Sequence, residues 1–99
     1  MAKIVWTPRA RNDLIRLRDF LDPQSAESAR RAVQTIREKL RTLRIAPAAG
    51  KPVDWLPVGY HEWFIPFGKS GYLVLYRLFE DQVVIQALRH ARESGYPSG

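Results

Sequence analysis

The segment from Tyr72 to His90, YLVLYRLFEDQVVIQALRH, decides the fold because it contains two strands and the turn that joins them. Residues Tyr72–Phe79 and Val83–Arg89 are rich in β-branched, aromatic and leucine side chains, which favour extended structure. The acidic pair Glu80-Asp81 separates the two apolar runs. This short polar break predicts an antiparallel hairpin with a two-residue turn.

The turn also predicts which residues share a face of the hairpin. It places Phe79 opposite Gln82 and Arg77 opposite Val84, and side chains alternate between the two faces of a strand. The smoother apolar face, which we expect to meet the rest of the core, comprises Tyr72, Val74, Tyr76, Leu78, Val83, Ile85 and Ala87. The opposite face comprises Leu73, Leu75, Arg77, Phe79, Gln86, Leu88 and His90.

A third strand, Tyr60–Phe67, precedes the hairpin, and the Gly68–Gly71 turn connects the two. The same alternation places Glu62 on the face that carries Arg77. That face is mixed, because charged and amide groups stand among exposed phenylalanine and leucine side chains. It is either a docking surface for a partner or an ordinary solvated face on which Glu62 and Arg77 form an ion pair worth ~0–1 kcal/mol.

The first half of the chain predicts one short strand and two helices. Lys3–Trp6 is apolar and β-branched, and Thr7-Pro8 after it suits the start of a helix. Asp22-Pro23 breaks this helix and is expected to cap a second one, whose apolar residues recur at spacings of three and four from roughly Gln24 to Leu43. The order β-α-α-β-β-β indicates an α+β fold, with a helical hairpin packed on one face of a small antiparallel sheet.

Composition narrows the class of protein. A chain of 99 residues forms one domain, here taken as residues 1–99. It has no cysteine and two histidines, so a thiolate metal site is excluded and neither a metal ion nor a cofactor is expected. No apolar run approaches the ~18 residues of a membrane span, and the N-terminal residues lack a signal-peptide pattern. We therefore expect a cytoplasmic protein.

The charge balance favours an anionic partner. Lysine and arginine number 16 against 10 aspartate and glutamate residues, which gives a net charge of +6 and an isoelectric point near 10.2. Nucleic acid and an acidic protein that neutralises the chain are both compatible with this excess.

Four features, in this order, resemble the RelE/ParE superfamily, the toxins of type II toxin–antitoxin modules. They are the opening strand with its Trp6-Thr7-Pro8 and Asp13-Leu14, the arginine-rich helical hairpin, the Pro47…Gly50-Lys51-Pro52 loop, and Leu73–Arg77 followed by a charged turn, an apolar strand and Arg89–Tyr96. The resemblance spans nearly the whole chain. It implies a cognate acidic antitoxin, a segment of which folds on the toxin as a helix or an added strand.

The superfamily has two main activities on one fold. RelE-like members cut messenger RNA in the ribosome, and ParE-like members poison DNA gyrase. The nucleases usually carry an arginine three residues before a strand tyrosine, but counting back from Tyr76 gives Leu73, and the arginine is Arg77. The resemblance therefore favours the ParE branch, with no catalytic residues and with DNA gyrase as the target. The residues expected to bind a partner are Glu62, Arg77, Gln86, His90 and Arg92.

Two other functions stay open at this point. In a RelE-like ribosome-dependent endonuclease, His90 would serve as acid–base group, Arg92 as a phosphate contact and Tyr96 as a stacking ring, and Arg77 would complete the catalytic set. A non-toxic nucleic-acid-binding module would instead bind DNA or RNA with a steep dependence on salt. All of these interpretations place Arg77 and His90 side by side on the face that the helices leave open.

Overall fold

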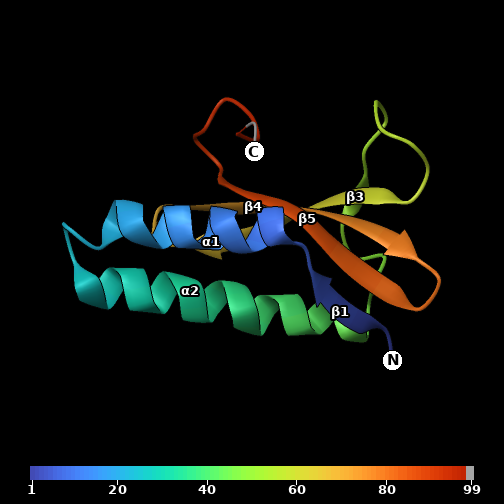
Figure 1. Cartoon of the computed structure of the whole chain (residues 1–99), viewed down its shortest axis with the longest axis horizontal. Coiled ribbons are helices and arrows are strands. Elements are labelled where there is room, and N and C mark those ends of the chain that lie inside the picture. Colours follow the sequence, from blue (N-terminus) through green and yellow to red (C-terminus); the bar gives the residue numbers. More distant parts are fainter. Residues whose placement is uncertain (98–99) are drawn as a thin grey trace.

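The computed structural model describes residues 1–97 and confirms the expected order of elements (Figure 1). Two helices follow the first strand, and a short 3-10 turn, η1, extends the second helix. A two-residue strand, β2, which the sequence did not predict, precedes the three long strands. The bounds are β1 Lys3–Trp6, α1 Pro8–Leu21, α2 Ala26–Arg41, η1 Thr42–Arg44, β2 Lys51–Pro52, β3 Tyr60–Phe67, β4 Ser70–Phe79 and β5 Gln82–His90.

The five strands form one sheet in the order β1-β5-β4-β3-β2. The pairs β5–β4 and β4–β3 are antiparallel, as the sequence predicted, and the unpredicted β2 is antiparallel to β3, but β1 runs parallel to β5. The prediction of a purely antiparallel sheet was therefore wrong at its first strand. Tight turns join β3, β4 and β5 and force them to reverse, whereas the whole length of both helices lies between β1 and the later strands, so no turn imposes a direction.

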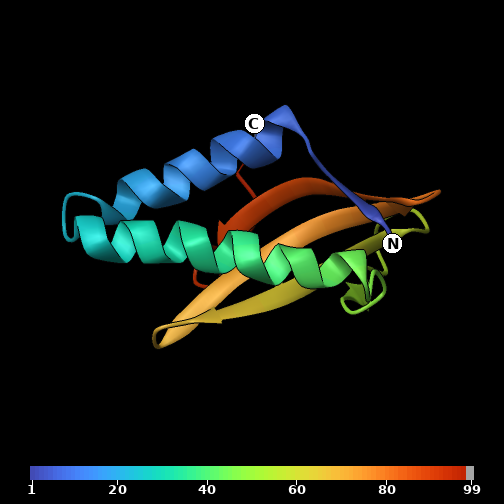
Figure 2. The ribbon, with the colours of Figure 1, turned by 90° about the horizontal axis from the view of Figure 1, so that it is seen from below.

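The two helices cover one face of the sheet, and the core lies between the layers (Figure 2). Buried residues of α1, α2, η1, β3, β4 and β5 make one contiguous cluster, to which β4 contributes Tyr72, Val74 and Tyr76. The prediction that this face of β4 meets the helices is confirmed. We call the opposite face, which α1 and α2 leave uncovered, the outer face.

The caps of the two helices differ in how well the sequence predicted them. Thr7 caps α1 as expected, because its hydroxyl accepts a hydrogen bond from the Ala10 amide at 3.1 Å, and Pro8 occupies the first turn. The prediction that Asp22 caps the second helix was wrong. Asp22 still ends α1 in helical geometry, and the hydroxyl of Ser25 accepts from the Ser28 amide to start α2.

A buried tyrosine explains the loop motif that precedes the sheet. The Tyr76 hydroxyl donates to the carbonyl of Pro47 at 2.7 Å and accepts from the amide of Gly50 at 2.9 Å. A side chain at Gly50 would collide with that ring, since an added Cβ would lie 2.8 Å from the Tyr76 oxygen. The loop therefore closes on the end of the core through a satisfied polar group.

Neither helix within residues 1–97 reaches the length and apolar character that crossing a bilayer requires.

Candidate functional site

The predicted register holds for the first half of the hairpin and changes in its second half. Phe79 pairs with Gln82 and Arg77 with Val84, as expected, and Tyr76 pairs with Ile85. The next pair is Leu75 with Ala87, so Gln86 is an extra residue in β5. A bulge of this kind reverses the face to which every later residue of the strand points.

This bulge overturns the expected position of His90. Beyond Gln86, Leu88 pairs with Val74 and His90 with Tyr72, both of which belong to the face that the helices cover. The imidazole of His90 meets the ring of Tyr72 edge-on, with centroids 5.4 Å apart. The predictions that Leu88 and His90 lie on the outer face were therefore wrong. Leu88 is instead completely buried in the core.

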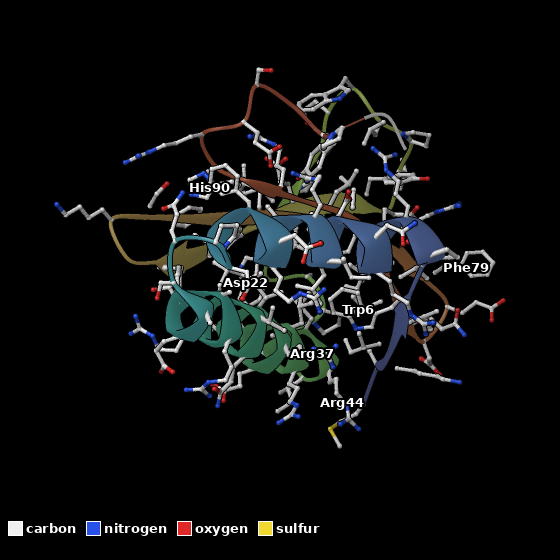
Figure 3. All side chains as sticks on the ribbon, turned by 60° about the vertical axis from the view of Figure 1, so that its left-hand side comes forward. Trp6, Asp22, Arg37, Arg44, Phe79 and His90 are labelled. Carbon is white, nitrogen blue, oxygen red and sulfur yellow. The ribbon has the colours of Figure 1, made fainter. Side chains whose placement is uncertain are left out.

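Arg77 and His90 consequently do not form one surface. They lie on opposite faces of the sheet and about 16 Å apart along the strands, at ~3.3 Å per residue. Figure 3 shows the separation, because Phe79, against which Arg77 packs, and His90 lie at opposite ends of the hairpin. The face shared by Arg77, Glu62 and Tyr60 on β3 and β4 is as predicted.

The bulge lies just beyond the point where β5 stops pairing with β1 and begins to contact α1. Its first half pairs with β1, which ends at the pair Trp6–Ile85. Beyond that point, side chains of α1 bind the free edge. The Thr7 hydroxyl donates to the carbonyl of Ile85 at 2.7 Å, and Asp13 Oδ2 accepts from the Leu88 amide at 2.9 Å. The helix thus satisfies edge groups that a further strand would otherwise bind.

Arg16 and Glu93 connect this edge to the C-terminal segment. Arg16 donates to the carbonyl of Leu88 at 3.2 Å and to Glu93 Oε2 at 2.8 Å. The other carboxylate oxygen of Glu93 accepts from the backbone amide of His90 at 2.8 Å. No part of this network was predicted from the sequence. The one available signal was the presence of Asp13 and Glu93 in the motifs that carry the family resemblance.

The segment Ala91–Pro97 then returns across the outer face. The Tyr96 hydroxyl donates to Glu62 Oε2 at 2.7 Å, and the guanidinium of Arg89 lies 5.2 Å from the centre of the Tyr96 ring. Arg9 Nη2 donates to the carbonyl of Pro97 at 2.6 Å. The prediction that Ala87 lies on the face of the core was wrong, because the bulge places it opposite Leu75 on the outer face, where it is completely buried. We call this segment the C-terminal strap.

The strap holds Tyr96 as a neutral phenol. Burial raises the pKa of Tyr96 far above its ordinary value of 10.0, and the hydrogen bond and charge of Glu62 raise it further. A tyrosine in this state donates a hydrogen bond to Glu62, keeps its proton and does not act as a base near neutral pH. The guanidinium of Arg89 already stacks on one face of its ring.

Glu62 and Arg77, which the sequence allowed to pair with each other, have other partners instead. Within residues 1–97 no ion pair joins the two side chains. The guanidinium of Arg77 instead lies between the rings of Tyr60 and Phe79, 5.5 Å from each ring centre. Glu62 is bound by Tyr96.

The remaining two residues expected to bind a partner, Gln86 and Arg92, belong to the bulge and to the strap. Gln86 is the bulged residue and is half-buried. Arg92 is exposed on the strap, and its backbone amide donates to Nδ1 of His90 at 3.1 Å. Across residues 1–97 no three histidine, cysteine or acidic side chains are grouped in a way that could hold a metal ion.

Comparison with known proteins identifies the class to which this fold and strap belong. Residues 4–95 match the family model described as ParE toxin of type II toxin–antitoxin system, parDE. The curated protein Toxin RelE3 of Caulobacter vibrioides is 32% identical over 93 residues, which cover 94% of this chain and 98% of that protein. A chain of the chromosomal ParDE toxin–antitoxin system from P. aeruginosa has the same fold, with a TM-score of 0.72 at 21% identity, over 91% of this chain and 96% of that one.

The chain therefore belongs to the ParE toxin family of type II toxin–antitoxin systems. It is a toxin of the RelE/ParE superfamily, and the resemblance inferred from the sequence is confirmed. Membership of a toxin–antitoxin family implies a cognate antitoxin as partner.

Proposed function

We propose that this toxin inhibits growth by poisoning DNA gyrase, without cutting RNA, and that its cognate antitoxin neutralises it. One observation carries the proposal: the four side chains that an RNA-cutting mechanism would need do not meet. His90 packs on Tyr72 on the helix side, Arg77 lies between two aromatic rings on the outer face, and Arg92 projects from the strap. Tyr96 is occupied by Glu62.

General acid–base cleavage requires the proton-transferring groups within hydrogen-bond reach of one reacting phosphate. A site that spreads its candidates over both faces of a sheet does not supply that geometry. The position of Leu73 adds to this argument. Leu73 stands on the outer face where the nucleases usually carry an arginine, and its side chain offers no charge to a phosphate.

Ribosome-dependent cleavage is the second candidate, and the name of the 32% identical relative, Toxin RelE3, favours it. Under this alternative, His90 and Arg92 would have to converge on RNA after a rearrangement of the strap. Such a mechanism predicts that both residues are needed for cleavage, whereas gyrase poisoning predicts no such requirement.

Two assays with the same protein preparation separate the candidates. Purified gyrase should lose supercoiling activity when the toxin is added and should accumulate cleaved DNA, while messenger RNA in a translating extract should stay intact. The variant His90→Ala/Arg92→Ala should inhibit gyrase as strongly as the wild-type protein does. Cleavage of messenger RNA that this variant abolishes, without any effect on gyrase, would replace the proposal with the nuclease alternative.

The outer face is the surface that we assign to the antitoxin. Phe64 and Phe79 are 46% and 50% exposed on this face. Arg77, which packs against Phe79, supplies a positive charge for the acidic partner. Preincubation with the acidic protein encoded beside the toxin gene should restore supercoiling. Arg77→Ala should weaken this rescue, and Arg31→Ala, an exposed arginine on α2, should leave it intact.

A further inference from the structure

Three arginines at the end of the second helix form a surface that the proposed function has not used. Arg37, Arg41 and Arg44 are spaced by four and three residues, so they lie on one face of α2 and its extension η1. All three are exposed, and within residues 1–97 none of them lies within ion-pair distance of a carboxylate. We call them the arginine ridge.

The ridge borders a groove between α2 and β1. The groove has a volume of about 450 Å³, and Ile4 and Trp6 of β1 line its other side. Its lining within residues 1–97 includes no carboxylate. In Figure 3 the labelled Arg37, Arg44 and Trp6 lie along this side of the molecule. Cations without a counter-charge beside a concave surface raise the local concentration of an anionic ligand.

The other large groove differs in charge. It has a volume of about 510 Å³ between α1 and α2, and Asp22 and Glu38 line it together with Arg18, Arg30 and two arginines of the ridge, Arg37 and Arg41. Arg18 pairs with Asp19 at 3.1 Å, and Arg30 pairs with Glu27 at 2.7 Å. Arg18 and Arg30, which already have carboxylate partners, attract a polyanion less strongly than the ridge does, so the ridge is the better candidate.

The spacing of the ridge suits a phosphodiester backbone. Along the helix axis the three guanidinium-bearing residues are about 6 Å and about 5 Å apart, at ~1.5 Å per residue in α2 and slightly more in η1. This span of about 11 Å corresponds to about three nucleotide steps of one DNA strand, which rises ~3.4 Å per nucleotide. Guanidinium groups also bind phosphate in a bidentate manner, with charge-assisted hydrogen bonds.

We propose that the arginine ridge binds the phosphate backbone of duplex DNA. The choice of DNA rests on the proposed function, since a toxin that acts on gyrase meets the DNA segment that the enzyme holds. The contact is made to phosphates alone and is therefore independent of base sequence. It supplies affinity for the gyrase–DNA complex in addition to whatever contacts the toxin makes with the gyrase protein.

Fluorescence anisotropy with a labelled 20-base-pair duplex of arbitrary sequence tests the proposal on the full-length protein. Three phosphate contacts predict that log K falls against log[KCl] with a slope of about −2.7, at ~0.9 per contact. The variant R37Q/R41Q/R44Q should bind at least about tenfold more weakly at low salt, with a slope close to zero. Glutamine keeps a high helix propensity, so the variant is expected to fold.

The matched control is R18Q/R30Q/R31Q, which removes the same number of charges from exposed arginines that have carboxylate partners. Its affinity for DNA should stay within about threefold of the wild-type value, because paired arginines release few counterions from DNA. Thermal melts of both variants verify that the fold is kept. Equal losses in the two variants would overturn the proposal, because net charge alone would then explain binding.

Further arms distinguish the other outcomes. Tighter binding to an RNA hairpin than to DNA would reject DNA as the ligand, and loss of antitoxin binding by the ridge variant with unchanged DNA binding would make the ridge a protein interface. If the wild-type protein inhibits gyrase but binds no DNA at low salt, the proposal that the ridge binds DNA is overturned and the proposed function stands. A protein that binds DNA through the ridge without inhibiting gyrase overturns the proposed function while the DNA surface stands.

Discussion

Asp13 shows how one residue links the helical layer to the edge of the sheet. Within residues 1–97 it is the charged residue that folding buries, with 6% of its surface exposed. Its Oδ2 accepts from the amide of Leu88, 75 residues away, and its Oδ1 lies 3.8 Å from Arg16. A buried carboxylate is tolerated when it has hydrogen-bond donors, and here the donor is an edge amide that has lost its strand partner.

Asp13→Ala should therefore lower the free energy of unfolding by about 2 kcal/mol, the usual cost of leaving a buried amide without its acceptor. Urea denaturation followed by circular dichroism measures this change. Asp19→Ala on the same helix is the control, because Asp19 is exposed and its pair with Arg18 is a surface contact. A loss as small as that of the control would show that water satisfies the Leu88 amide.

At the scale of the element, the two helices show which local rules decide a boundary. Thr7-Pro8 starts α1 as expected, but at the second boundary Asp22-Pro23-Gln24 forms the turn and Ser25 provides the cap. Both Asp22 and Ser25 are acceptable capping residues. With Ser25 as the cap, α2 begins at Ala26, and this start places Ala29, Ala32 and Ile36 in buried positions against the rest of the protein. Packing thus decides between two local signals of similar strength.

Ser25→Ala should destabilise the protein by about 1 kcal/mol because it removes the acceptor for the Ser28 amide. Asp22→Ala should change stability by no more than about 0.5 kcal/mol, since only the backbone of Asp22 takes part in ending α1. Chemical denaturation of the two variants side by side gives both values. The reverse ranking would restore Asp22 as the cap.

At the scale of the whole molecule, three tyrosines in the core and the strap make the free energy of unfolding depend on pH. Tyr72 and Tyr76 belong to the core and Tyr96 to the strap, and burial is the main cause that raises the pKa of all three above 10.0. Above about pH 10 the unfolded chain releases these protons while the folded chain retains them. The unfolded state then binds fewer protons, so the free energy of unfolding falls as pH rises.

The stability that these tyrosines contribute is therefore fully present below pH 10 and is lost as pH increases beyond it. Urea denaturation between pH 8.5 and about pH 11 should show this decline. Tyr96→Phe should make the decline shallower, because its ring keeps the packing against Arg89 but has no proton to release. Parallel curves for the wild-type protein and Tyr96→Phe would mean that the phenol of Tyr96 is accessible to solvent in the folded state.

The sequence by itself determined the order of the elements other than β2, the hairpin register up to Tyr76, the cap at Thr7 and the placement of Glu62 and Arg77 on the outer face. These features follow from local rules, because strand alternation, two-residue turns and N-caps act over a few neighbouring residues. The same local rules predict that side chains continue to alternate beyond Gln86, and this assumption placed His90 on the wrong face.

Only the tertiary structure decided the parallel pairing of β1, the bulge at Gln86 and the return of the C-terminal strap. Each depends on groups that are far apart in sequence, such as Thr7 with Ile85 and Tyr96 with Glu62. An edge of β5 that loses its strand partner after Trp6 needs new hydrogen-bond partners, and α1 provides them only once the layers are packed. That requirement has no periodic signature in the sequence.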